Sequence, residues 1–320
     1  MSVTQLLVLP HIKVHNANAL SSPFTIGFPA MTGFLGAVHA LQRKLNQLPL
    51  SVRFNGVGVI NHQADLQTHK GTNDFVHSII GAGNPLDKTG ARSAFIEEAR
   101  IHLDVSLIIE VEDLAFDQRE LMLEHAYRIL QGSMKMAGGD IFSLSYPQFH
   151  IIDDQEPASY ALLQRQLMPG YAIVERRELM QESMSDKTDA LDALIDCLAI
   201  HHQCNVNDEM SADEQKVQWS RGRKQTGWVV PIATGFHAIS ELSQAKNQRD
   251  ENTPHRFAES VVTLGEFKMA HRVKHLEQLL WRYHVDNESS LYLCKQDEIL
   301  KQETIASNIE VIEESLDDQF

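Results

Sequence analysis

Hydrophobic residues in the first half of the chain alternate between the spacing of strands and the spacing of helices. Apolar runs that favour strands lie at 5–14, 52–64, 101–111 and 140–152. Between these runs, apolar residues recur every three to four positions at 33–48 and 117–136, as on one face of a helix. The order strand, helix, strand, strand, helix, strand is that of a ferredoxin-like or RRM-like core in an α+β fold.

Residues 65–98 interrupt this unit between its second and third strands. They contain polar runs and two turn signals, at 81–85 and 87–90, and little sustained periodicity. We therefore expect an insertion with the character of an extended hairpin or finger. Its basic residues are either phosphate contacts or solvated loop charges, and they are Lys70, Lys88 and Arg92.

The second half of the chain is less regular. Helical spacing occurs at 160–167 and 188–200, and short strands are expected at 171–175 and 227–232. The acidic and polar composition of 205–218 predicts a mobile loop. A last long helix is expected at 264–284, where one apolar stripe comprises Met269, Val273, Leu276, Leu280 and Tyr283.

These patterns divide the chain into three expected parts. The RRM-like core with its insertion spans 1–152, and an extension of strands and the last long helix, packed on that core, spans 153–295. The segment 296–320 is an acidic tail, because it holds eight acidic residues and the single base Lys301.

The composition is that of a globular protein, with 43% hydrophobic and 22% charged residues among 320. No uncharged apolar run is long enough to span a bilayer, and the N-terminus lacks the basic start and cleavage site of a secretory signal. We therefore expect a cytoplasmic protein without membrane contact. Cys197, Cys204 and Cys294 are too few and odd in number for a disulfide framework, so we expect free thiols.

The net charge of −15 argues against a stand-alone, nonspecific nucleic-acid binder, because phosphate binding usually requires a basic surface. The tail carries close to half of this charge, and the remainder of the chain is still acidic. Any RNA site must therefore be a local patch. An acidic protein that shares its RNA with partner chains is compatible with this charge.

The segment 16–28 leaves the first strand and crosses a loop before the first helix. Its polar side chains could present donors and acceptors to RNA bases, and they are Asn16, Asn18, Ser21 and Ser22. Phe24 and Phe28 stand among them and could stack on bases. The alternative is a structural loop whose phenylalanines belong to the core.

Two glycines follow the second predicted helix. Gly138 and Gly139 either end that helix as a C-cap or allow bare backbone amides to approach phosphate.

Basic residues gather in two later segments. Arg221, Arg223 and Lys224 lie between two tryptophans and either contact nucleic acid or neutralise the acidic loop before them. Arg249 and Arg256 lie in a loop, where they either bind phosphate or base edges or form internal salt bridges.

Metal binding and catalysis are the remaining alternatives. Cys197, His201 and Cys204 have helical spacing, but a structural metal site needs four ligands and no fourth is evident, so we expect neither a metal nor another cofactor. General acid and base chemistry on RNA is open to four histidines, His11, His15, His39 and His62.

Several segments, in order along the chain, are similar to one protein family. They are NANALSSPFTIGFP (16–29), TGFLGAVHALQR (32–43), HLDVSLII (102–109), MAGGDIF (136–142), PGYAIVERRE (169–178), GWVVPI (227–232) and RDENTPHRFAESVVTLGEF (249–267). Together they resemble the Cas-five-like family, the second Csy subunit of type I-F CRISPR surveillance complexes, also called Cascade or Csy complexes. The resemblance runs from the first strand to His284.

This resemblance implies a RAMP core with a thumb at 65–98, in a noncatalytic RNA-binding subunit of an antiviral ribonucleoprotein. Such a subunit grips the 5′ handle of the CRISPR RNA together with the large (first Csy) subunit. It caps the filament of backbone (third Csy) subunits, and the complex recognises target double-stranded DNA through the guide. Processing of precursor RNA belongs to a separate subunit.

Under this resemblance, Asn16, Asn18, Ser21 and Ser22 read handle bases, Phe24 or Phe28 stacks, and Gly138 and Gly139 approach the backbone. Arg249 and Arg256 hold phosphates. The thumb bases contact RNA, and the cluster of Arg221, Arg223 and Lys224 contacts entering DNA. Two alternatives stay open: a metal-independent endoribonuclease that processes precursor CRISPR RNA, and a subunit that contacts only proteins.

Overall fold

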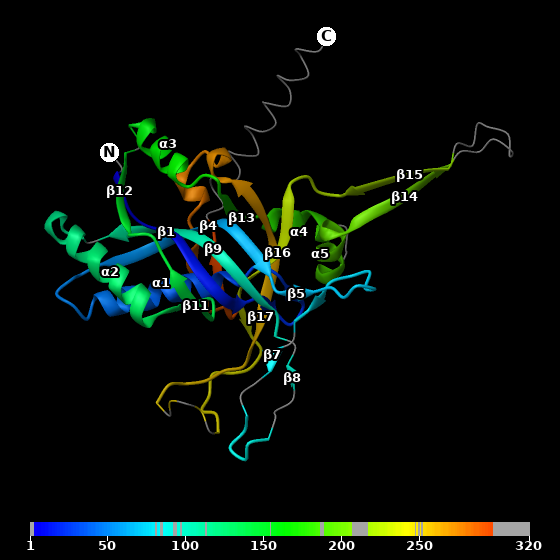
Figure 1. The fold of residues 1–320 in the computed structure, drawn as a ribbon, viewed down its shortest axis with the longest axis horizontal. Coiled ribbons are helices and arrows are strands. Elements are labelled where there is room, and N and C mark those ends of the chain that lie inside the picture. The colour runs from blue at the N-terminus through cyan, green and yellow to red at the C-terminus, as the bar shows by residue number, and fades with distance from the viewer. Residues whose placement is uncertain are drawn as a thin grey trace, which may run out of the picture.

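The structure of the protein is a computed structural model that describes residues 3–80, 82–83, 86–91, 95–96, 98–112, 114–153, 155–185, 189–206, 217–246, 248, 250 and 252–296. Figure 1 shows one large, twisted sheet, helices packed against it, and several projections. The expected α+β character is therefore confirmed. None of the helices in the described part of the chain is long and apolar enough to cross a membrane.

The main sheet is antiparallel throughout its described pairs. Its strands are β1 (Val3–Asn18), β4 (Arg53–Leu66), β9 (Arg100–Glu112), β10 (Lys135–Met136), β11 (Gly139–Ser143), β12 (Gln148–Asp153), β13 (Tyr171–Glu175), β16 (Trp228–Ala238), β17 (Ala258–Met269), β18 (Arg282–Asp286) and β19 (Leu291–Lys295). Their order is β10-β11-β1-β9-β4-β13-β17-β16-β19-β18, and β12 pairs with the N-terminal half of β1.

The helices of the described chain are α1 (Met31–Leu45), α2 (Arg119–Ser133), α3 (Pro157–Gln166), α4 (Arg177–Ser185) and α5 (Ala190–Leu198). Three 3-10 turns add η1 (Phe116–Gln118), η2 (Ala270–Arg272) and η3 (Leu276–Gln278). The six elements predicted for the first half all occur, although the strand predicted at 140–152 is divided into β11 and β12.

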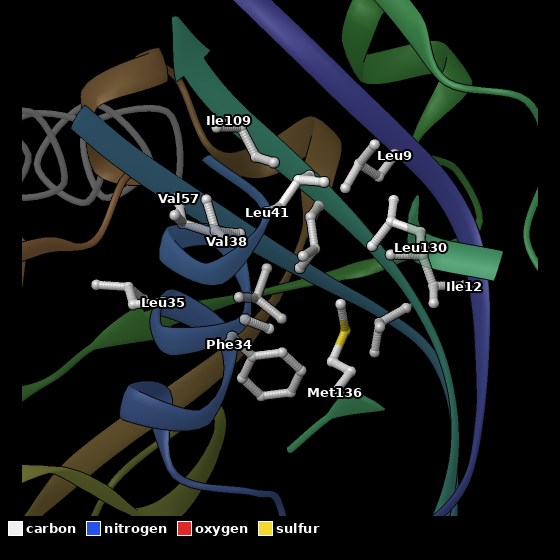
Figure 2. Packing of buried hydrophobic residues seen from close by; sticks show 14 of the residues in the cluster. Leu9, Ile12, Phe34, Leu35, Val38, Leu41, Val57, Ile109, Leu130 and Met136 are labelled. Carbon is white, nitrogen blue, oxygen red and sulfur yellow. The ribbon is translucent and has the colours of Figure 1, made fainter. Parts of the chain in front are cut away.

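One face of the β1, β9 and β4 strands is covered by α1 and α2. Figure 2 shows Phe34, Leu35, Val38 and Leu41 of α1 beside strand residues such as Leu9, Val57 and Ile109. Since each fully buried side chain of this size contributes about 1.5–3 kcal/mol, this layer is a main source of stability. The alternation of apolar and polar residues along the strands places the intervening residues on the opposite face.

The opposite face is only partly covered. Leu6, Val8, Ile60 and Ile108 pack against α3, η2 and η3 in a second apolar cluster. This cluster lies towards the N-terminal end of β1, close to α3 (Figure 1). The other end of the same face carries polar residues, and the candidate site lies there.

The prediction of a long helix at 264–284 is wrong. Residues 264–269 belong to β17, and 270–286 form η2, η3 and β18. The apolar residues recur every three or four positions because the chain makes two 3-10 turns here. Val273, Leu276 and Leu280, in and beside these turns, are buried in the second apolar cluster. Trp281 then pairs with Val57 and is fully buried. The extension is therefore built of strands with the shorter helices α3 to α5.

Smaller differences concern the ends of helices. The helix predicted at 33–48 corresponds to α1, which follows the N-cap residue Ala30. Helix α4 was not predicted from the sequence. The helix predicted at 117–136 ends at Ser133, so Gly138 and Gly139 are not its C-cap. They lie instead at the turn between β10 and β11.

The projections include two that the sequence indicated as irregular. The predicted insertion forms short strand pairs, β5 (Thr68–His69) with β6 (Ser78–Ile79) and β7 (Ala82–Gly83) with β8 (Phe95–Ile96). A long ribbon of β14 (Ile200–Val206) and β15 (Val217–Arg223) extends beyond α5 (Figure 1). The ends of the loop predicted at 205–218 belong to these strands, and its centre lies outside the described residues, as does the tail beyond Gln296.

Candidate nucleic-acid interface

The uncovered end of the sheet, here called the open face, is formed by β11, β1, β9 and β4. Two irregularities in β1 shape it, because register shifts occur on either side of the stretch Ile12 to Val14. His11 (φ 47°) and Asn16 (φ 56°) lie in these shifts with left-handed backbone conformations. The shifts place the half-buried ring of His11 and the exposed side chain of Asn16 among the polar residues of the open face.

The loop after β1 meets the β10–β11 turn. The backbone amide of Asn18 donates to the carbonyl of Ala137 at 2.8 Å. Ala137 (φ 47°) and Gly138 (φ 79°) form a two-residue turn of the type that suits hairpins. The structure therefore brings Asn16 and Asn18 together with the two predicted glycines, which lie about 120 residues later in the chain.

The backbone at this junction is closely packed. A β-carbon on Gly139 would lie 2.6 Å from the carbonyl oxygen of His15 and 2.7 Å from the amide of Ala17. A β-carbon on Gly138 would meet only the Asn18 side chain, at 3.7 Å, and Gly138 is exposed. Gly139 is thus required by packing, whereas Gly138 presents bare backbone to the solvent.

The other predicted residues of this loop have distinct environments. Ser22 is buried, and its hydroxyl bonds the Thr25 hydroxyl at 2.7 Å and accepts from the amide of Phe24. Ser21 also bonds Thr25, at 2.9 Å. Phe28 is 7% exposed and packs on core phenylalanines, whereas Phe24 is 73% exposed. Of the two rings, Phe24 is the one that a base could reach.

A hydrogen-bonded chain crosses the middle of the open face. The amide of His11 donates to the Ser106 hydroxyl at 3.0 Å, which donates in turn to Nε2 of His62 at 2.7 Å. Nδ1 of His62 donates to the carbonyl of Pro169 at 2.7 Å. Burial lowers the pKa of His62 below its ordinary value of 6.5, which matches a neutral ring with both nitrogens bonded.

His11 completes this group. Its Nδ1 lies 3.0 Å from a carboxylate oxygen of Asp104, and its ring stacks on that of His62 with centroids 4.2 Å apart. The close stacking leaves no space for a phosphate between the two rings. Since His62 also has no free nitrogen, this pair is poorly suited to general acid and base catalysis.

A row of three rings lies beside this group. Phe142 of β11 stacks on His15 of β1 with centroids 4.5 Å apart and planes 6° apart. His15 is tilted against His102 of β9 at 4.8 Å. Nδ1 of His102 accepts from the amide of Asn16 at 3.1 Å, which leaves the ring proton on Nε2. Phe142 was not predicted as a site residue, because an aromatic residue in a predicted strand indicates a core position.

The other predicted residues that the structure describes lie on elements other than β11, β1, β9 and β4. Lys70 and Lys88 are exposed in the insertion, Arg256 is exposed in the loop before β17, and Arg221 and Arg223 are exposed on β15. Lys224 forms an ion pair with Asp196 at 2.7 Å. Arg92 and Arg249 lie outside the described residues.

Two alternatives from the sequence, acid and base chemistry by histidines and metal binding near Cys197, involve residues in different parts of the fold. His39 is exposed on α1, on the far side of the sheet from the other three histidines. Cys197 is buried and Cys204 exposed, and the described residues contain no group of His, Cys, Asp or Glu side chains that could hold a metal ion.

Comparison with known proteins identifies a family and a similar curated protein. The chain matches the family described as CRISPR-associated protein (Cas_Csy2) over residues 7–294. It is also similar to a curated protein named CRISPR-associated protein Csy2 from Pseudomonas aeruginosa (strain UCBPP-PA14). The two sequences are 34% identical over an alignment of 317 residues. The alignment covers 91% of this chain and 96% of the relative.

Proposed function

Because the chain belongs to the CRISPR-associated Csy2 family, and is thus a subunit of a type I-F Csy complex, we propose that it binds the guide RNA of that complex through its open face. The observation that carries this proposal is the junction of Asn16 and Asn18 with the β10–β11 turn. Exposed amides of two asparagines, a bare glycine backbone and neighbouring aromatic rings are the groups with which proteins hold single-stranded RNA.

The finer assignment is that this subunit is noncatalytic and grips the 5′ handle of the CRISPR RNA together with the large subunit. The strand order β11/β12, β1, β9, β4, with α1 and α2 on one face, supports a ferredoxin-like RAMP core for this half. The insertion between β4 and β9 is then the thumb that meets the first backbone subunit and caps the filament. Target DNA is recognised by the assembled complex through guide pairing.

The test is co-expression of the chain with its partner subunits and a CRISPR RNA, followed by size-exclusion chromatography and crosslink mapping. Asn16→Gly keeps the left-handed backbone and removes the amide, and it is combined with Asn18→Ala. We expect about tenfold weaker retention of the guide, since each neutral hydrogen bond contributes about 0.5–1.5 kcal/mol. His39→Ala, on the far side of the sheet, is the matched control.

Three other results would contradict the proposal in distinguishable ways. Full guide retention by the double variant, with crosslinks elsewhere on the chain, would move the RNA site away from the junction. Assembly without any RNA crosslink to this chain would favour the protein-contact alternative. Shortened precursor RNA after incubation with the purified chain alone would favour a ribonuclease.

A further inference from the structure

The row Phe142, His15 and His102 runs across three neighbouring strands of the open face. Each ring stands on a different strand, β11, β1 or β9, and these strands are hydrogen-bonded neighbours. Phe142 and His15 are almost parallel, so each covers one face of the other. The row therefore has a defined direction, and Phe142 is its outer end, towards the edge strand β10.

The outer face of Phe142 is accessible. The edge strand β10 pairs only Lys135 with Asp140 and Met136 with Gly139, so among the described residues no β10 residue lies opposite Phe142. The ring is 70% exposed although one of its faces is occupied by His15. A flat aromatic ligand of similar size could thus extend the row by one member without moving the backbone.

The charges around the row favour an uncharged ring over a phosphate. Asp140, next to Phe142 along the same face, pairs with Lys135 at 2.7 Å. Asp104, two residues after His102, lies 3.0 Å from His11. Lys13 is exposed between them. Positive and negative groups are thus interspersed, and a phosphate would meet two carboxylates, whereas stacking of a base requires no net charge.

We propose that an unpaired nucleobase of the guide RNA stacks on the outer face of Phe142 and becomes the fourth ring of this row. This inference rests on the proposed function and names the part of the guide RNA, a nucleobase, that binds at Phe142 on the open face. His15 supports the ring of Phe142 from behind and His102 supports His15, so the platform is formed before the base arrives. Because every base has a flat face, this contact is tolerant of sequence.

The direct test uses the assembled complex with guide RNAs that carry 2-aminopurine at successive positions of the 5′ handle. Stacking on an aromatic ring quenches this fluorescent base, and we expect one position to be quenched in the complex and released by Phe142→Ala. Phe142→Ala should also weaken guide binding about 5- to 100-fold, whereas Phe142→Tyr keeps the flat ring and both signals.

The matched control is Phe116→Ala, which removes another exposed phenylalanine, 81% exposed and outside the open face, in the 3-10 turn before α2. Thermal unfolding of each variant checks that the fold is intact. Unchanged quenching and guide affinity in Phe142→Ala, while Asn16 and Asn18 still crosslink to RNA, would overturn this inference and leave the proposed function standing.

A second result would also overturn it. If Phe142→Ala releases a partner subunit while the guide keeps its affinity for the remaining complex, an aromatic side chain of a protein covers Phe142. Absence of any RNA contact on this chain would instead contradict both the proposed function and this inference.

Discussion

His62 is a histidine whose two ring nitrogens are both used inside the fold. Nδ1 donates to the carbonyl of Pro169 and Nε2 accepts from the hydroxyl of Ser106. Protonation of Nε2 would require the Ser106 hydroxyl to turn from donor to acceptor, and burial already disfavours the charged ring. The residue that the sequence suggested as an acid or base is thus a structural link between β4, β9 and the segment before β13.

This arrangement predicts a pH dependence of stability. The folded pKa of His62 is lowered by burial, against an ordinary value of 6.5, so the unfolded chain binds the proton more readily. Stability from this residue is therefore fully present above about pH 6.5 and is lost as the pH falls towards the folded pKa. We expect the free energy of unfolding to fall between pH 7.5 and 5.5, and to fall less steeply in His62→Gln.

Urea unfolding at a series of pH values is the measurement. Burial also lowers the pKa of His150, so His150→Gln should reduce the same slope, and the double variant should reduce it further. An identical slope in wild type and His62→Gln would show that His62 is not held neutral by the fold.

The hairpin of β10 and β11 shows how a short element positions a site. Its turn requires positive φ at Ala137 and Gly138, and Gly139 then passes so close to β1 that a side chain does not fit. The pairing of His15 with Asp140 follows from this contact and sets the register in which Phe142 stacks on His15.

Gly139→Ala should therefore destabilise the protein by about 1–3 kcal/mol, the usual cost of overpacking. Gly132→Ala is the control, because no atom lies within 4 Å of its added carbon and the residue lies in α2. That variant should gain about 0.5–1 kcal/mol from helix propensity. Equal effects of the two substitutions on urea unfolding would contradict the close approach of the backbones.

The elements of the first half were predictable because strands alternate and helices repeat every 3.6 residues. The structure of 264–284 was not predictable in this way. The spacing of its apolar residues arises from two 3-10 turns that pack against strands distant in the sequence. The meeting of Asn18 with Ala137, and of His15 with Phe142, depends on the register and shifts of β1. No local pattern encodes that register, so Phe142 could be found only in the structure.

The two halves of the chain share one sheet, and β13 joins them by pairing with β4 on one side and β17 on the other. Glu175 at the end of β13 is 1% exposed and forms an ion pair with Arg177. Its amide donates to the Gln296 side chain at 2.9 Å, and the amide of Gln296 donates to its carboxylate at 3.1 Å. The last described residue is thereby fastened to the centre of the sheet.

Arg177→Met tests how much this link stabilises the whole molecule. Removal of the guanidinium takes this ion pair from the buried carboxylate of Glu175, and breaking a buried pair costs up to about 3–5 kcal/mol. Glu175→Gln combined with Arg177→Met removes the charge as well, so we expect the double variant to recover part of the loss. Because β13 joins both halves of the sheet, the loss should appear as one lowered cooperative transition in urea, followed by fluorescence and circular dichroism together. A cost below about 1 kcal/mol, typical of an exposed pair, would show that solvent reaches Glu175 and that this ion pair contributes little to the stability of the sheet.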